Sequence, residues 1–358
     1  MAYITSRPTA LAPGATFPRI TLATLCAALT TPLQAFEASD PFAIRALTPT
    51  RPALTISGEL QRMPCQALPA DAAYGKLEVV DLALCKNPTT REAWSYARVQ
   101  AAQVGLAKSD FLPTVDGQVA ASRIRADSRS TTQRNASLTL SWLLFDFGAR
   151  SANLEVATQL FNAAVSTLDS TVQSVFLGAL QAYYNVQAAR AAVTAALESE
   201  RASRESLSAA EVRYRVGTGT PADRLQAQTA WSQTTLFRIR AEGVLRNSQG
   251  RLANIMGLDA NQPLRLDDIP ASAPDDSFEG DVATLIAEAR ERRPELKAAE
   301  AELKAAQSGV AYARAAGLPT LSLNAGPRWE DIGGASANAR SIGLIVNLPL
   351  FSGFNTTY

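Results

Sequence analysis

The chain contains a repeat of itself at an offset of 206 residues. Each copy has a proline that opens a helical run, a Leu-Pro-Thr step that ends it, and a Leu-Phe pair further along. The landmarks are Pro88 and Pro294, Pro113 and Pro319, and Leu144-Phe145 and Leu350-Phe351. Self-similarity at a constant spacing indicates a repeat architecture and has to be recognised before local patterns are interpreted. We therefore expect two equivalent helix–strand–strand units.

The composition excludes several classes of function. The formal net charge of +1 gives no strong field that would attract nucleic acid, so no nucleic-acid partner is expected. The absence of histidine removes histidine-based triads and the commonest metal ligand. Serine and acidic residues do not cluster with a base or with a Gly-rich phosphate loop. We expect no enzymatic activity, no metal and no cofactor.

The N-terminus is typical of a secretory signal peptide over residues 1–35. Arg19 leads into the apolar stretch 20–29, which is too short for a permanent membrane span, and a small-residue cleavage site follows at Ala35. Residues 36–70 are rich in Pro, Thr and Ala without periodicity and are expected to form a flexible extension.

Two cysteines remain after removal of the signal peptide, Cys65 and Cys85. An even number of cysteines in an exported protein favours a disulfide, here closing a loop of about 20 residues. The alternative is a pair of unbonded buried thiols.

The first repeat is expected over residues 71–280. From Ala149 to Val216 the chain has no proline, and apolar residues recur at the three- and four-residue steps of a coiled coil. Such a helix would be roughly 100 Å long. The predicted elements are a helix at 77–112 (entered or interrupted at Pro88), strands at 114–124 and 136–145, a long helix at 149–216, a tip turn at 217–221, a return helix at 222–256 and an equatorial segment at 257–280.

The second repeat, residues 281–358, is expected to be incomplete. Its predicted elements are a helix at 282–317 and strands at 320–330 and 341–351. By analogy with the first copy, the chain stops where a second long helix would begin, and at least about 100 residues would be missing.

The four predicted strands alternate apolar and polar side chains and span about ten residues each, the length of a tilted strand in a bilayer. Aromatic residues near the strand ends are typical of a membrane-interface girdle. These girdle candidates are Trp142, Phe145, Phe147, Trp329 and Phe351. The alternative is an ordinary sheet packed on the helices, with the aromatic residues in its core.

Strand number bears on oligomeric state. Open sheet edges are not tolerated in a membrane, and single-chain outer-membrane barrels have at least eight strands. If the strands face lipid, four of them require several copies, and three copies would supply twelve strands.

The chain resembles the TolC-type outer-membrane efflux and secretion channels over about residues 65–354. The resemblance rests on the order of the two helix–strand–strand units and on short motifs. These motifs are Ala-Leu-Cys-Lys-Asn-Pro at 83–88, the two Leu-Pro-Thr junctions, Trp-Leu-Leu-Phe-Asp-Phe-Gly at 142–148 with a weaker copy at 348–353, and Arg-Tyr-Arg-Val-Gly at 213–217. Within the family, the narrower expectation is a type I secretion channel of the cyclolysin-exporter kind.

The resemblance implies a mixed α and β fold. Long coiled-coil hairpins would form an α-barrel, and four transmembrane strands per subunit would contribute to a 12-stranded β-barrel in a homotrimer. The implied partners are outer-membrane lipid, a periplasmic adaptor (membrane fusion) protein and an inner-membrane pump of the ABC transporter class. The implied role is a passive exit duct that spans the outer membrane and extends into the periplasm.

The resemblance also implies that the hairpin tip docks the adaptor. The residues concerned are Arg213, Val216, Gly217, Thr218, Asp223 and Leu225. The alternative is that the glycines only make the turn and the charged residues are solvated. A different class of protein, a soluble periplasmic adaptor or scaffold built on one helical hairpin, also stays open. Two helix–strand–strand copies favour the duct.

Overall fold

The computed structural model describes residues 40–48, 73–126, 129–262, 264–267 and 282–351. The chain divides into two units, Met1–Pro41 and Phe42–Tyr358, and the helices and strands discussed below belong to the second. Several expected features lie outside the described residues. They are the signal peptide, Cys65, most of the extension at 36–70, and residues 268–280 of the equatorial segment.

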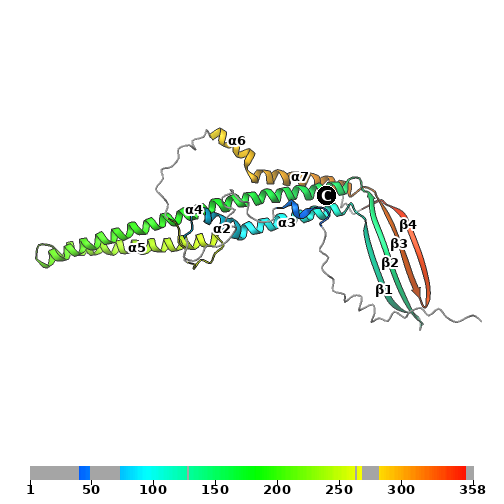
Figure 1. Ribbon diagram of the computed structural model, residues 1–358, viewed down its shortest axis with the longest axis horizontal. Helices are drawn as coiled ribbons and strands as arrows, with labels where there is room; N and C mark the ends of the chain where they lie inside the picture. The colour runs from blue at the N-terminus through cyan, green and yellow to red at the C-terminus, as the bar shows by residue number, and fades with distance from the viewer. Residues whose placement is uncertain (1–39, 49–72, 127–128, 263, 268–281, 352–358) are drawn as a thin grey trace, which may run out of the picture. The chain divides into compact units, whose positions relative to one another are not determined.

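The elements follow one another in the order expected from the repeat (Figure 1). The first copy comprises α2 (Lys76–Lys86), α3 (Pro88–Ser109), β1 (Thr114–Ala126), β2 (Arg129–Phe145), α4 (Ala149–Arg215) and α5 (Pro221–Ile255). The second comprises α6 (Val282–Arg292), α7 (Pro294–Ala315), β3 (Thr320–Ile332) and β4 (Ala335–Asn347). A short 3₁₀ helix, η1 (Ile44–Leu47), precedes both. Each of α6, α7, β3 and β4 begins 206 residues after its counterpart (Lys76 to Val282, Pro88 to Pro294, Thr114 to Thr320, Arg129 to Ala335).

Both predicted helical runs are pairs of helices. The run expected at 77–112 is interrupted at Pro88, one of the two possibilities left by the sequence, and the run expected as one helix at 282–317 is broken between α6 and α7. The cause is the same in both copies, because the residue before a proline is pushed out of the helical region. Asn87 and Arg293 both have extended ψ angles, of 129° and 117°.

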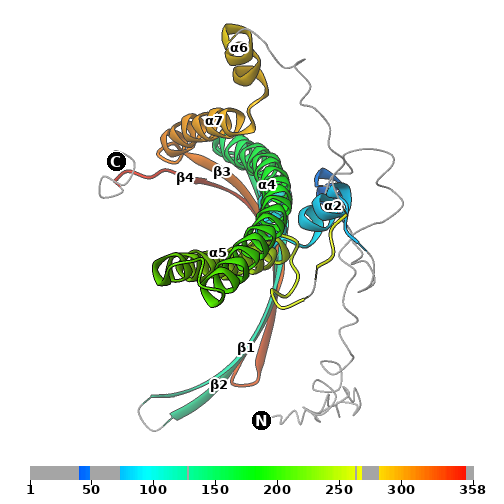
Figure 2. The same cartoon turned by 90° about the vertical axis from the view of Figure 1, so that its left-hand side faces the viewer.

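Helix α4 is the continuous scaffold on which the other helices pack. Helix α5 contacts α4 toward the hairpin tip, while α3 and α7 contact α4 toward the sheet (Figure 1). The end-on view of Figure 2 shows α5 and α7 beside α4. The buried positions of α3 and α7 are mostly alanines, among them Ala97, Ala101, Ala301 and Ala305. Small side chains let helix backbones approach closely, so the high alanine content is used in helix–helix contacts.

The larger buried cluster lies where α2 meets α4 and α5. Leu82 and Leu84 of α2 pack with Val186 of α4 and with Leu252 and Met256 of α5, all nearly inaccessible. The segment at Tyr74 is tied to the segment at Leu266 by a parallel bridge. This cluster fixes the base of the α4–α5 hairpin. None of the described helices combines the length and the apolar character needed to cross a membrane.

The four strands form one antiparallel sheet in the order β1-β2-β3-β4. All four strands extend further toward their connecting turns than predicted. Most of the polar segment expected as a loop between 124 and 136 continues the ladder, with Arg123 opposite Thr132 and Arg125 opposite Ser130. The last strand runs over 335–347 rather than 341–351, so Phe351 follows the strand. Polar residues are typical of loops, but a strand exposed on both faces also carries them.

The register separates an apolar face from a polar face. Leu140 is opposite Val115 of β1 and Ala325 of β3, and Ala325 is opposite Ile342 of β4. The alternate residues on the other face are mostly polar, as at Thr139 and Ser141 of β2, with Ile345 of β4 an exception. Apolar side chains such as Val119 and Ile342 are each 80% exposed. The sheet thus presents an uncovered apolar surface rather than packing it on the helices.

Candidate functional site

The tip of the α4–α5 hairpin is a tight turn closed by backbone hydrogen bonds. The carbonyl oxygen of Arg213 accepts from the backbone N–H of Thr218 at 2.9 Å, from that of Gly219 at 3.1 Å, and from the Thr218 hydroxyl at 3.2 Å. Gly217 has φ of 78°, a left-handed conformation that glycine adopts without strain. At Gly219 a Cβ atom would come within 3.1 Å of the Tyr214 nitrogen. The turn therefore favours glycine at Gly217 for its backbone conformation and at Gly219 because a side chain would press on the neighbouring backbone.

The start of α5 is fixed by a capping box. The Thr220 side chain accepts from the Asp223 N–H, and the Asp223 carboxylate accepts from the Thr220 N–H at 3.0 Å and from its hydroxyl at 2.7 Å. Hydrogen bonds from the Thr220 side chain and backbone, with a contribution from the charge of Arg213, lower the pKa of Asp223 below its ordinary value. The carboxylate is therefore charged at neutral pH and committed to the turn.

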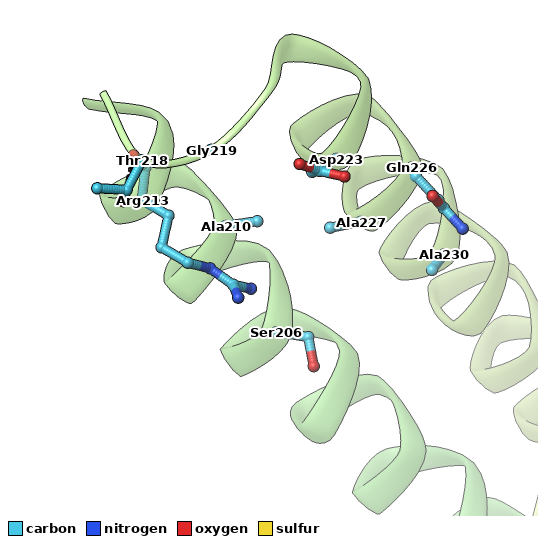
Figure 3. A pocket seen from close by; sticks show the side chains of 9 residues that line it. All are labelled: Ser206, Ala210, Arg213, Thr218, Gly219, Asp223, Gln226, Ala227 and Ala230. Carbon is cyan, nitrogen blue, oxygen red and sulfur yellow. Dashed lines mark hydrogen bonds between the residues drawn. The ribbon is translucent and has the colours of Figure 1, made fainter. Parts of the chain in front are cut away.

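A pocket of about 410 Å³ lies between the two helices just below the turn (Figure 3). The side chain of Arg213 extends along α4 toward Ser206, and Asp223 and Gln226 lie on the facing helix. Val216 and Leu225 lie outside this pocket and are 66% and 54% exposed. The tip thus combines a small polar pocket with exposed apolar side chains.

The structure brings together three of the six residues predicted at the tip, Arg213, Thr218 and Asp223, in the lining of one pocket. Two features were missed by the sequence analysis. Thr220 caps α5, a role that the Thr-x-x-Asp spacing of 220–223 indicates. The guanidinium of Arg224 lies 4.8 Å from the ring centre of Tyr214, which links the two helices. No local signal in the sequence points to that stacking.

The candidate girdle residues fall into two groups. Trp142, Phe145 and Phe147 gather where β2 gives way to α4, with the Phe145 and Phe147 rings 4.8 Å apart. A register irregularity between Leu143 and Phe145 places Phe145 opposite Leu321, on the apolar face. Trp329 lies nearer the end of the sheet where β3 turns into β4, and it is opposite Ala136 on the same face. An interfacial role for these residues, and for Phe351, stays a prediction.

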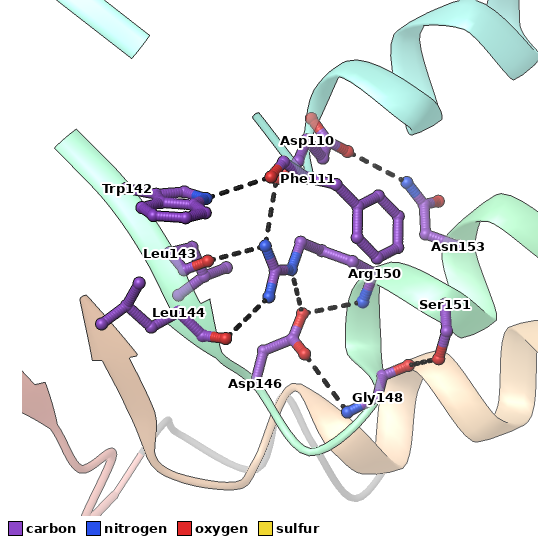
Figure 4. Close-up of polar contacts among 10 residues, drawn as sticks. All are labelled: Asp110, Phe111, Trp142, Leu143, Leu144, Asp146, Gly148, Arg150, Ser151 and Asn153. Carbon is purple, nitrogen blue, oxygen red and sulfur yellow. Dashed lines mark hydrogen bonds and ion pairs between the residues drawn. The ribbon is translucent and has the colours of Figure 1, made fainter. Parts of the chain in front are cut away.

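An arginine network holds the junction between the sheet and the helices (Figure 4). The Arg150 guanidinium donates to the Asp146 carboxylate at 2.9 Å, to the Leu143 carbonyl at 2.7 Å and to the carbonyls of Leu144 and Asp110 at 3.3 Å. Burial alone would raise the pKa of Asp146. Hydrogen bonds from Arg150 and from the Gly148 N–H outweigh that effect, and the pKa lies below its ordinary value. Asp146 and Arg150 are not among the site residues predicted from the sequence.

Cys85 is buried and disulfide-bonded, and its partner lies outside the described residues. The pairing with Cys65 therefore stays a prediction. No group of metal-binding side chains occurs among the described residues.

Comparison with known proteins agrees with the fold and the repeat. A family model described as outer membrane efflux protein matches residues 79–258 and 285–357, the larger part of the chain. The chain belongs to the outer membrane efflux protein family. The resemblance expected from the sequence, the mixed fold of long helices with a four-stranded sheet, and the outer-membrane localisation are confirmed.

Several members of this family are similar over most of the chain. Protein CyaE of Bordetella pertussis is 34% identical over 302 residues, which cover 81% of this chain and 63% of that protein. The toluene efflux pump outer membrane protein TtgC of Pseudomonas putida is 26% identical over 298 residues, covering 77% and 59%. The chain thus spans about three fifths of these relatives' length.

Solved structures show the same fold. The CmeC outer membrane channel of Campylobacter jejuni superposes with a TM-score of 0.67 at 22% identity, covering 79% of this chain and 64% of that one. The outer-membrane channel OprN superposes with a TM-score of 0.65 at 23% identity, covering 76% and 64%. The family is one of outer-membrane efflux proteins rather than of enzymes. Membership favours a duct over the soluble adaptor or scaffold considered as an alternative.

Proposed function

We propose that this chain is one subunit of a homotrimeric exit duct that crosses the outer membrane and continues into the periplasm. The observation that supports this most directly is the sheet. It has an uncovered apolar face, and its outer strands β1 and β4 each have one neighbour only within the described residues. An open sheet edge is not stable in hydrocarbon, so the edges of one subunit pair with those of the next. Three subunits give a closed barrel of about 12 strands.

The polar face of the sheet would then line the channel, and α4, α5, α3 and α7 would form the wall of its periplasmic extension. The duct needs no catalytic group, since substrate moves through it under the control of other components. By the family resemblance, those components are a periplasmic adaptor and an inner-membrane pump of the ABC transporter class.

The tip of the α4–α5 hairpin is the proposed adaptor contact. Gly217 and Gly219 keep the turn narrow, Val216 and Leu225 offer exposed apolar side chains, and Arg213 and Asp223 line the adjoining pocket. A narrow tip with an apolar rim and a polar pocket suits end-on contact with another helical hairpin.

The oligomer is tested on outer-membrane fractions by gel migration with and without heating and by native mass spectrometry of the detergent-released protein. A heat-dissociable trimer is expected, and a monomer that needs no detergent would contradict the duct.

The docking site is tested with a photo-crosslinking residue at Leu225 and a matched one at Val244. Both side chains belong to α5 and are similarly exposed, at 54% and 57%. Adaptor adducts should form at Leu225 and not at Val244. Equal labelling at both positions would contradict adaptor docking at the hairpin tip.

A further inference from the structure

The apolar face of the sheet carries an unbalanced group of arginines, each placed on the turn side of the apolar residues of its own strand. By the strand register, Arg123, Arg125, Arg134 and Arg340 lie on this face together with one carboxylate, Asp331. All four arginines are exposed, and within the described part of the chain none forms an ion pair. The opposite face is different, because Arg328 lies 3.6 Å from the carboxylate of Glu330.

The arginines lie just beyond the apolar band. Arg340 is two residues from Ile342 on β4, and Arg134 is two residues from Ala136 on β2. The helix end of the same face, at Phe145 and Leu321, is apolar. If the helices lie on the periplasmic side, as the proposed function requires, the arginines lie at the level of the outer-leaflet headgroups.

The internal repeat predicts how two copies pair. Within one chain, β2 and β3 are the junction between the repeats, and Arg134 is opposite Asp331. The corresponding junction between copies joins β4 to β1 of the next copy. Arg134 of β2 corresponds to Arg340 of β4, and Asp331 of β3 corresponds to Arg125 of β1. Arg340 should therefore lie opposite Arg125 of the neighbouring copy. By the same correspondence, the pair Ala136–Trp329 becomes Ile342 opposite Arg123.

The two junctions therefore differ in charge. Inside the chain, Arg134 and Asp331 are opposite each other and carry opposite charges. Between copies, Arg340 would lie directly opposite Arg125, and Arg123 would lie in the next pair on the same face. Like charges directly opposite each other across a ladder are destabilising. An anion at this boundary would remove the repulsion. Guanidinium groups are well suited to bind phosphate oxygens with two parallel hydrogen bonds.

From this geometry we infer that the boundary between two subunits binds the phosphorylated headgroup of an outer-leaflet lipid. Arg340 of one copy and Arg123 and Arg125 of the next form the site, and neither copy has it alone. The acyl chains lie along the apolar band next to Ile342 and Val119. The inference rests on the proposed trimeric duct, and its test is arranged to separate the two.

The boundary is tested first by disulfide cross-linking of the full chain in the outer membrane. By the 206-residue correspondence, the pair Leu140–Ala325 predicts that Val346 of one copy lies opposite Val119 of the next. V119C/V346C should therefore give cross-linked oligomers under oxidation. V115C/V346C, which is four residues out of register, is the control. No oligomer with the first pair would overturn both the duct and the lipid site.

The site is then tested by native mass spectrometry of the oligomer with lipid A bearing both phosphates or neither. The unaltered protein should prefer the phosphorylated form by at least about tenfold. R125Q/R340Q should lose the preference, R125K/R340K should keep most of it, and R328Q on the polar face should leave it unchanged. A cross-linked oligomer without any phosphate preference, or with equal loss in R328Q, would overturn the lipid site and leave the duct intact.

Discussion

The carboxylate of Asp146 and the guanidinium of Arg150 lie 2.9 Å apart where strand β2 gives way to helix α4. Both side chains are largely buried, with 8% and 13% of their surface exposed. Because Arg150 also donates to carbonyl groups at the end of β2, one side chain fixes the end of the strand, the turn and the first turn of the helix.

We expect Asp146→Asn to destabilise the protein by about 3 kcal/mol, because it leaves a buried guanidinium without its counter-charge. Thermal unfolding in detergent, followed by circular dichroism, measures the effect. The matched control is Glu205→Gln, which removes the i,i+4 partner of Arg201 in a pair whose side chains are 73% and 71% exposed. That change should cost less than about 1 kcal/mol. Equal effects would contradict the role of the junction.

The same carboxylate predicts a pH dependence. Its pKa lies below the ordinary value of 3.8, so the pair contributes stability above that value. The contribution is lost as the pH falls through the lowered pKa of the folded state. The difference in unfolding temperature between the unaltered protein and Asp146→Asn should therefore shrink on acidification below about pH 4. A difference that grew in acid would reverse the assignment.

The middle of the α4–α5 hairpin depends on Arg238. Its guanidinium binds Glu200 of α4 and lies 2.6 Å from Glu242, while Thr235 donates to Glu200 at 2.7 Å. Arg238→Met should loosen the hairpin, since Glu200 loses a charged donor. Faster amide exchange in α5 is the readout. Arg240→Met, at an exposed position of the same helix, should leave exchange unchanged.

The approach of β2 to β3 requires glycine at position 326. A Cβ atom there would lie 1.9 Å from the carbonyl oxygen of Leu138, a backbone atom that cannot turn aside. Gly326→Ala should therefore separate the two strands and abolish heat-modifiable oligomers in outer-membrane fractions. Gly343→Ala on β4, where a Cβ atom meets nothing within 4 Å, is the control. Normal assembly of Gly326→Ala would show that the strands tolerate displacement.

The cap of α5 predicts the stability of the tip. Thr220→Val removes the side-chain acceptor for the Asp223 N–H and should cost about 1 kcal/mol. Thr220→Ser keeps the oxygen and should cost little. Amide exchange at residues 217–224 reports the difference. If both variants exchange alike, the turn is held by the Arg213 carbonyl contacts rather than by the cap.

Much of this fold can be predicted from the sequence, because prolines break helices locally and the repeat transfers each assignment to the second copy. A proline that breaks one helix breaks its counterpart, as at Pro88 and Pro294, and alternation marks the strands. The Arg150 network could not be predicted, because its partners are carbonyl groups and an aspartate that only the folded junction brings together. The tip turn predicted at 217–221 compares with a connection between Arg215, where α4 ends, and Pro221, where α5 begins. The Tyr214–Arg224 stacking depends on the angle between two helices and has no local signal.

The two copies of the helix break differ in one contact. The Asn87 side chain accepts from the Thr89 N–H at 2.9 Å and donates to the Ile255 carbonyl at 3.1 Å, whereas Arg293 makes no side-chain cap. Gly257 also lies so close to Lys86 that a Cβ atom would be 2.7 Å from its carbonyl oxygen. The first joint is therefore held against the end of α5. The bend at Asn87 thus joins two helices that are far apart in the sequence, so the angle it sets between α2 and α3 also places the base of the α4–α5 hairpin.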